Sequence, residues 1–95
     1  MTQAGTNPAF KVGASAEQHE GVWLGTYTNG RGLTAVVAEG FPTREQAHSA
    51  ADRFLPIGEE DSDQYYDWKE DSKYPGRYAV YRKMRTGLEL VRESR

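Results

Sequence analysis

The sequence predicts an α+β domain, an antiparallel sheet of four to five strands in the order ββα-ββ with one helix packed on a face. Two stretches with alternating apolar and polar residues, each interrupted by a glycine-containing turn, indicate two hairpins. A stripe of alanines at helical spacing between them indicates one helix. The length of 95 residues leaves room for one small domain.

Residues 1–20 are mostly small and polar, and beyond the first methionine their sizeable apolar side chains are Phe10 and Val12. We expect a flexible N-terminal arm or an edge strand around residues 10–12, followed by a single small α+β domain over residues 21–95. No basic start precedes an apolar stretch, which argues against a secretory signal. No apolar run approaches the roughly 20 residues of a membrane span, so we expect no membrane partner.

Residues 21–40 predict the first hairpin, because β-branched and aromatic side chains flank the dipeptide Asn29-Gly30. Asn-Gly is the strongest short-range hairpin signal, since both residues tolerate positive φ. Alternation along the first strand separates its side chains onto two faces. These are Val22, Leu24 and Thr26 on one face, and Trp23, Gly25 and Tyr27 on the other.

Residues 43–55 predict the helix. Thr43 and Gln46 have the spacing of a capping box, in which the Thr43 hydroxyl accepts the backbone N–H of Gln46. Pro56 then stops the helix, because proline has no N–H to donate and clashes with the preceding turn. The apolar stripe of this helix is rich in alanine, whose small side chain lets the helix lie close to a sheet. It consists of Ala47, Ala50, Ala51, Phe54 and Leu55.

The start of this helix also carries a local resemblance. The motif Phe41-x-Thr43-x-Glu45-x-Ala47-x-x-Ala50-x-Asp52 is similar to the helix start of the APETALA/ethylene-response-factor and integrase arm-type DNA-binding domains. The resemblance covers about a dozen of the 95 residues. It implies a three-stranded sheet followed by a helix, with DNA read by Arg and Trp on that sheet, where this chain offers Trp23 and Arg31. We do not assign the chain to either family on this motif.

Residues 58–72 form an acidic segment whose structure the pattern leaves open. A short strand over residues 64–69 would place Tyr66 and Trp68 on one face, and a loop or one irregular helical turn fits as well. Residues 59–72 carry seven carboxylates and one lysine. These carboxylates repel one another in a compact arrangement unless positive charge lies near.

Residues 73–95 predict the second hairpin, with strands over residues 77–84 and 88–91 and a turn between them. This segment carries seven basic side chains and two carboxylates, although the whole chain has a net charge of only −2. The acidic and basic segments either pair with each other across neighbouring strands, which we favour, or form two separate docking surfaces.

Few residues indicate catalysis. His19 lies in the arm and His48 on the polar side of the helix, and neither has ligand-like spacing to another histidine or a carboxylate pair. No Gly-x-Ser-x-Gly motif is present. The pattern Gly30-x-Gly32 falls in a hairpin and is interpreted as a turn, not a phosphate cradle. We therefore expect a protein that is not an enzyme and holds no cofactor.

A metal site is not expected either. Asp61-x-Asp63 begins like an EF-hand loop, but the later ligand and glycine positions are taken by Tyr65, Tyr66 and Ser72. Weak surface binding of Ca²⁺ or Mg²⁺ stays open. The chain has no cysteine, which excludes disulfides and thiolate zinc sites and allows a reducing compartment. We expect a cytoplasmic location.

Aromatic residues cluster in the second half, where six of the eleven fall within residues 65–81. They either complete the core or form a partly exposed binding patch, since Tyr and Trp are favoured in binding hot spots. We interpret the chain as a small interaction module of accessory or inhibitor type that binds another protein, and a homodimer is compatible with such a fold. The candidate partner-binding residues are Tyr65, Tyr66, Trp68, Tyr74, Tyr81, Glu59, Glu60, Asp61 and Asp63.

Two further functional hypotheses stay open. In one, the acidic segment imitates nucleic-acid phosphates and occupies a basic site on a partner. In the other, the basic hairpin itself binds nucleic acid, with tyrosines stacking on bases. The residues for this alternative are Arg77, Arg82, Lys83, Arg85 and Arg92.

Overall fold

The computed structural model describes residues 11–54 and 65–95, which form a small α+β domain with one helix and a mostly antiparallel sheet. The predicted fold class is confirmed, whereas the strand count of four to five and the order ββα-ββ are wrong in detail, because seven strands are present in this part of the chain. In chain order the elements are β1 (Gly13–His19), β2 (Val22–Thr28), β3 (Thr34–Phe41), α1 (Arg44–Asp52), β4 (Tyr66–Glu70), β5 (Tyr78–Met84), β6 (Gly87–Leu90) and β7 (Glu93–Ser94).

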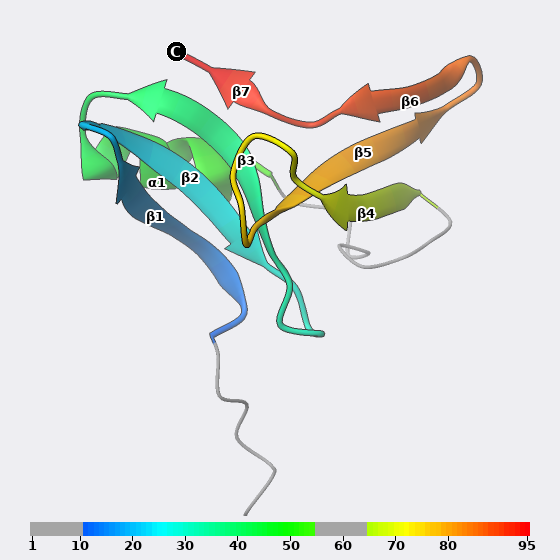
Figure 1. Cartoon of the computed structure of the whole chain (residues 1–95), viewed down its shortest axis with the longest axis horizontal. Coiled ribbons are helices and arrows are strands. Elements are labelled where there is room, and N and C mark those ends of the chain that lie inside the picture. The colour runs from blue at the N-terminus through cyan, green and yellow to red at the C-terminus, as the bar shows by residue number, and fades with distance from the viewer. Residues whose placement is uncertain (1–10, 55–64) are drawn as a thin grey trace, which may run out of the picture.

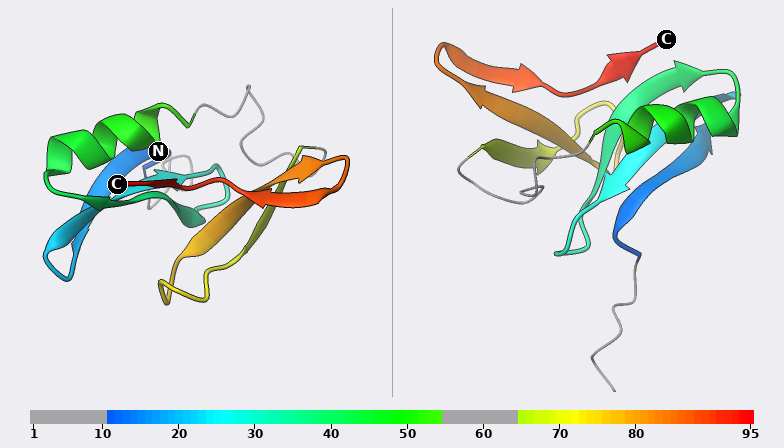
Figure 2. Two further views of the ribbon diagram at one scale, coloured as in Figure 1. Left: turned by 90° about the horizontal axis from the view of Figure 1, so that it is seen from above. Right: turned by 180° about the vertical axis from the view of Figure 1, so that it is seen from behind.

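The sheet has two parts that meet between β3 and β5. Its path runs β1-β2-β3-β5-β4, with β6 paired to β5 and the short β7 paired to β3. The β3–β5 and β3–β7 pairings are parallel and the others are antiparallel. In Figure 1, α1 covers the β1–β3 part, and the β5–β6 hairpin extends to the opposite side of the molecule. The two views of Figure 2 agree on this separation.

The extra N-terminal strand, β1 at Gly13–His19, comes from the segment that was expected to be a flexible arm or an edge strand around residues 10–12. It pairs with β2 over its full length, from Gly13 opposite Thr28 to His19 opposite Val22. A two-residue turn joins the strands, and both its residues have positive φ, 50° at Glu20 and 86° at Gly21, as hairpin turns of this length require. Small side chains on β1 pack against the helix side of the sheet, so tertiary packing forms a strand that local propensity does not predict.

The turn between β2 and β3 forms where Asn29 predicts it, but it is wider than a two-residue turn. The Asn29 side-chain oxygen accepts the backbone N–H groups of Arg31 and Leu33, at 2.9 and 3.0 Å. The positive φ, 83°, falls at Gly32. The asparagine therefore acts through its side chain, as in an Asx turn.

The helix begins and packs as its sequence predicts. Thr43 is the N-cap, and its hydroxyl accepts the backbone N–H of Gln46 at 3.2 Å. The buried face contains Ala47, Ala50 and Ala51, and the helix ends at Asp52, while Leu55 and Pro56 lie outside the described residues. On the sheet below, a Cβ added to Gly25 would lie 2.4 Å from the Ala47 carbonyl oxygen, so this glycine permits the close approach.

An aromatic core joins the two parts of the sheet. The ring of Phe54 makes edge-to-face contacts with Tyr27 from β2 and Tyr66 from β4, with centroids 5.2 and 5.9 Å apart. Val80 of β5 is fully buried in the same cluster. The acidic segment thus contributes a strand, β4, whose first residue belongs to the core.

Candidate functional site

The segment between β4 and β5 lies across the sheet face that α1 leaves open. Tyr74 from this segment packs against Leu24 and Val36, and all three side chains are buried. Its hydroxyl donates a hydrogen bond of 2.5 Å to the Glu39 carboxylate. The open face of the β1–β3 sheet is therefore closed by the chain's own residues 71–77.

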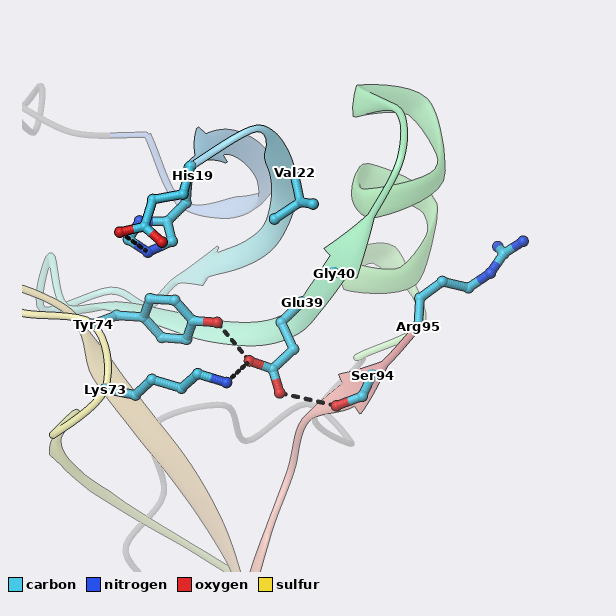
Figure 3. A pocket seen from close by; sticks show the side chains of 9 residues that line it. His19, Val22, Glu39, Gly40, Lys73, Tyr74, Ser94 and Arg95 are labelled. Carbon is cyan, nitrogen blue, oxygen red and sulfur yellow. Dashed lines mark hydrogen bonds and ion pairs between the residues drawn. The ribbon is translucent and has the colours of Figure 1, made fainter.

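Glu39 is the junction of three segments. Its carboxylate accepts hydrogen bonds from the Tyr74 hydroxyl, from the Lys73 ammonium at 2.9 Å and from the Ser94 hydroxyl at 2.9 Å. Figure 3 shows these side chains converging from β3, the β4–β5 segment and β7. A pocket of about 530 Å³ opens beside them, also lined by His19 and Arg95.

The hydrogen bonds around Glu39 fix the protonation states of the groups that meet there. Burial alone would raise the pKa of Glu39, but the hydrogen bonds from Tyr74, Lys73 and Ser94 and the charge of Lys73 lower it to about 2. Burial, together with the hydrogen bond to Glu39, raises the pKa of Tyr74. The hydrogen bond to Glu39 and its negative charge raise the pKa of Lys73. Glu39, Lys73 and Tyr74 are therefore each held in one charge state at neutral pH, which suits a structural role better than proton transfer. We call these three hydrogen-bonded residues the Glu39 clasp.

Two more ion pairs fasten the same segment. The Arg92 guanidinium donates to the Asp71 carboxylate, and both side chains are nearly inaccessible, at 6% and 3% exposure. Asp71 also accepts the backbone N–H groups of Lys73 and Tyr74, at 2.8 and 3.2 Å. At the other end of the segment, Arg77 makes a bidentate pair with Glu17 of β1, at 2.9 and 2.7 Å, and the hydrogen bond to Glu17 raises the pKa of Arg77.

The sequence-predicted aromatic residues divide into two groups. Tyr66 and Tyr74 are 7% and 6% exposed and belong to the core, with Trp68 packed half-buried against it. Tyr65 is 50% exposed and Tyr81 is half-buried. Tyr65 is therefore at the surface, Tyr66 and Tyr74 lie in the core, and Trp68 and Tyr81 are both half-buried, Trp68 against the core cluster.

The basic candidates do not form one surface. Arg77 and Arg92 are engaged in the ion pairs described above, and Arg82 donates to Glu89 of β6 at 3.3 Å. Lys83 also interacts within the protein, and Arg85 is exposed at the tip of the β5–β6 hairpin. Within the described residues, the basic segment is paired mainly with carboxylates of the chain itself.

The acidic segment, residues 58–72, and the basic segment, residues 73–95, do contact each other. However, their charged side chains are not directly opposite each other on the neighbouring strands, as the sequence-based prediction favoured. Strands β4 and β5 are antiparallel neighbours, yet Asp67 lies opposite Tyr81 and Arg82 opposite Tyr66. An ion pair does join the two segments, but it is the buried one of Asp71 with Arg92. The predicted acidic residues Glu59, Glu60, Asp61 and Asp63 lie outside the described residues.

The strands β4, β5 and β6 present a second face, on which two rows of side chains cross the strands. The cross-strand register gives these rows, because residues directly opposite each other share a face. The backbone N–H of Lys83 donates to the Tyr65 carbonyl at 2.9 Å, which extends the β4–β5 register by one pair. The rows are Tyr65, Lys83 and Leu88, and Asp67, Tyr81 and Leu90.

This face is the most exposed apolar surface of the β4–β6 part. Tyr65, Leu88 and Leu90 are 50%, 47% and 42% exposed. Sequence reasoning missed the two leucines as candidates. The signal was available, because Leu88 and Leu90 alternate on one face of a strand too far along the hairpin to reach the helix.

The described residues contain neither a cluster of metal-ligating side chains nor a helix that could span a membrane. No group of three or more His, Asp or Glu side chains gathers there in a way that would hold a metal ion. No helix within residues 11–54 and 65–95 is long and apolar enough to cross a membrane.

Comparison of the chain with known protein families, curated proteins and solved structures found no match. The three strands followed by a helix have the order that the local resemblance implies. Trp23, however, packs on the helix side of the sheet, with the Arg44 guanidinium 6.0 Å from its ring. The opposite face is closed by residues 71–77, so the resemblance stays confined to the helix start.

Proposed function

We propose that this chain is a small non-enzymatic interaction module that binds another protein through the exposed face of β4, β5 and β6. The observation that carries the proposal is the pair of cross-strand rows, in which three exposed apolar or aromatic side chains surround Tyr81. Exposed apolar groups that cluster on one face mark interaction sites, whereas scattered ones do not.

The chemistry of this face suits a protein partner. Tyr65 and Tyr81 provide large, stiff contact area with a polar tip, and the two leucines provide apolar area without a charge. Asp67 and Lys83 lie in the same rows but already interact within the protein, Asp67 with Lys69 at 3.8 Å, so the apolar and aromatic side chains carry the proposed contact. A partner with a concave apolar site and a few polar groups at its rim would fit.

The acidic residues Glu59, Glu60, Asp61 and Asp63 precede Tyr65 by a few positions in the sequence and belong to the same proposal. They would add long-range attraction toward a basic partner, as expected for an accessory or inhibitor protein. We propose the cytoplasm as its location, which the cysteine-free composition allows.

Nucleic-acid binding through the basic hairpin has less support. Arg77, Arg82 and Arg92 already pair with carboxylates of this chain, so phosphate would have to compete for them. A fluorescence-polarisation titration with DNA and RNA at low salt tests this alternative. Salt-sensitive binding that is lost on replacing Arg85 would favour nucleic acid over protein as the partner.

Site-specific photo-crosslinking in an extract of the source cell tests the proposal. A photoreactive phenylalanine at Tyr65 or at Leu88 is expected to capture the same protein, because both side chains lie in one row of the face. The matched control places it at Val12, which is 45% exposed and lies before β1. Capture of the same protein from all three positions, or of none from Tyr65 and Leu88, would contradict the proposal.

A further inference from the structure

The outer edge of β6 is open within residues 11–54 and 65–95. This strand pairs with β5 on one side, and the sheet path places no other described strand on its second side. Figure 1 shows β6 at the margin of the molecule, and Figure 2 shows the same hairpin standing apart from α1 in two further views. An open edge presents backbone donors and acceptors that can pair with another strand.

The register shows which backbone groups face outward. The Val91 N–H donates to the Val80 carbonyl at 2.8 Å, so these opposite residues form a hydrogen-bonded pair. Such pairs alternate with non-bonded ones along an antiparallel ladder. The backbone groups of Leu88 and Leu90 therefore point away from β5, toward the open edge.

This edge also lacks the devices that block strand pairing. Edge strands are usually protected by lysine, proline or a bulge. Strand β6 reads Gly-Leu-Glu-Leu, and the carboxylate of Glu89 is occupied by Arg82. The opposite edge strand, β4, instead carries three charges in five residues.

We propose that β6 pairs with β6 of a second copy of this chain, antiparallel, about a two-fold axis through Glu89. This register places Leu88 opposite the partner subunit's Leu90, and Leu90 opposite the partner subunit's Leu88. In both pairs the outward backbone groups of one copy meet those of the other, so each pair exchanges two hydrogen bonds. The hydrogen-bonding pattern and the two-fold symmetry thus require the same register.

The strand sequence is self-complementary in its side chains. Each leucine lies beside a leucine of the second copy on the same face, where cross-strand apolar pairs stabilise a sheet. On the reverse face, Glu89 meets the partner subunit's Glu89, a like-charge contact that by itself opposes pairing. The Arg82 guanidinium, 3.3 Å from the Glu89 carboxylate of its own copy, offsets that repulsion. A strand from an unrelated protein would match this register only by chance, which favours the second copy as the occupant.

Pairing would also enlarge the exposed face. The two copies would form one sheet in the order β4-β5-β6-β6-β5-β4, with the apolar rows of both copies side by side. Stable interfaces use about 20–30 residues a side, far more than one copy presents on this face. The dimer does not depend on the proposed partner, because it needs only the chain itself.

Single cysteines test the register, since the natural chain has none. The two-fold axis brings residue 89 of both copies to a non-bonded antiparallel pair, at a separation that a disulfide can span. Glu89→Cys is expected to form a covalent dimer under mild oxidation. Met84→Cys, on the same hairpin and 47% exposed, is expected to form no covalent dimer because residue 84 lies far from the two-fold axis. Equal crosslinking of both variants, or none of Glu89→Cys, would overturn this register.

Sedimentation over a range of concentrations tests the dimer without any new cysteine. The natural chain is expected to show a monomer–dimer equilibrium that Leu90→Lys shifts to monomer and Met84→Lys leaves unchanged. Both variants place one lysine at an exposed apolar position, at 42% and 47% exposure, and circular dichroism checks that both fold. A natural chain that is monomeric at every concentration would overturn the dimer and leave the protein-binding proposal standing. Failed photo-crosslinking would instead overturn the protein-binding proposal and leave the dimer standing.

Discussion

Two regions of the sheet surface that α1 does not cover, one on β1–β3 and one on β4–β6, are treated in opposite ways. Both lie on the same side of the sheet, because Ala35 and Tyr78 are neighbours on the helix side and strand alternation puts Val36, Tyr81 and Leu90 on the other. The face of β1–β3 that α1 leaves open is closed by residues 71–77, whose charged side chains pair with Glu17, Glu39 and Arg92. The face of β4–β6 that carries Leu88 and Leu90 is left uncovered by the described residues. Charged side chains around residues 71–77 thus pair within the fold, whereas apolar side chains are exposed on β4–β6. We therefore assign binding to the face of β4–β6.

The largest expected effect comes from opening the closed face. Arg92→Leu leaves the Asp71 carboxylate buried without its cation, which should lower the free energy of unfolding by about 3–5 kcal/mol. Arg82→Leu is the matched control. Its pair with Glu89 is half exposed and should cost less than about 1 kcal/mol. Urea unfolding measures both, and equal losses would contradict the assignment of a structural role to the buried pair.

Acid should loosen the same face through Glu39. Its pKa is about 2 in the folded protein against 4.5 for the free group, so its contribution is present above pH 4.5. That contribution is lost as the pH falls through about 2. Glu39→Gln should flatten the pH dependence of stability between pH 4.5 and 2. An unchanged profile in this variant would show that other carboxylates govern the acid response.

A smaller effect is expected from removing one hydroxyl. Tyr74→Phe keeps the ring packed on Leu24 and Val36 but removes the hydrogen bond to Glu39. Loss of a hydrogen bond to a charged group should cost about 1.5–3 kcal/mol. The same variant should raise the pKa of Glu39, which a carboxyl titration followed by NMR would detect. No change in either quantity would contradict the Glu39 clasp.

The smallest effect on stability is expected on the uncovered face. Leu90→Ser changes a side chain that is 42% exposed and outside the core clusters. At a protein concentration low enough for the chain to be monomeric, the free energy of unfolding should change by no more than about 0.5 kcal/mol. A larger loss, measured by urea unfolding, would mean that Leu90 belongs to the fold and would weaken the contrast between the two faces.

The local signals of the sequence predicted the first hairpin and the helix well. Thr43 caps the helix and the alanine stripe is buried, because both depend on neighbours three or four residues away. Strand β1 was not predicted, because its small residues become a strand only under α1 and beside β2.

The candidate site was predicted only in part, because its residue types have two uses. In the sequence, the core residues Tyr66 and Tyr74 cannot be told from Tyr65 and Tyr81 of the uncovered face. Tyr66 enters the core because of its position on β4, and Tyr74 because it contacts Leu24, and neither fact is visible in the local sequence. The pairing of Glu39 with Lys73 spans 34 residues, and no local pattern encodes such a distance.

The most direct test of the contrast between the two faces is the affinity of the crosslinked partner for Leu90→Ser, measured by calorimetry beside its unfolding free energy. We predict binding at least about tenfold weaker, with stability unchanged, as for a residue at the centre of an interface. Val12→Ser, at an equally exposed apolar position, should bind as the natural chain does. Equal affinities for the natural chain and Leu90→Ser would contradict the assignment of the uncovered face as the binding surface.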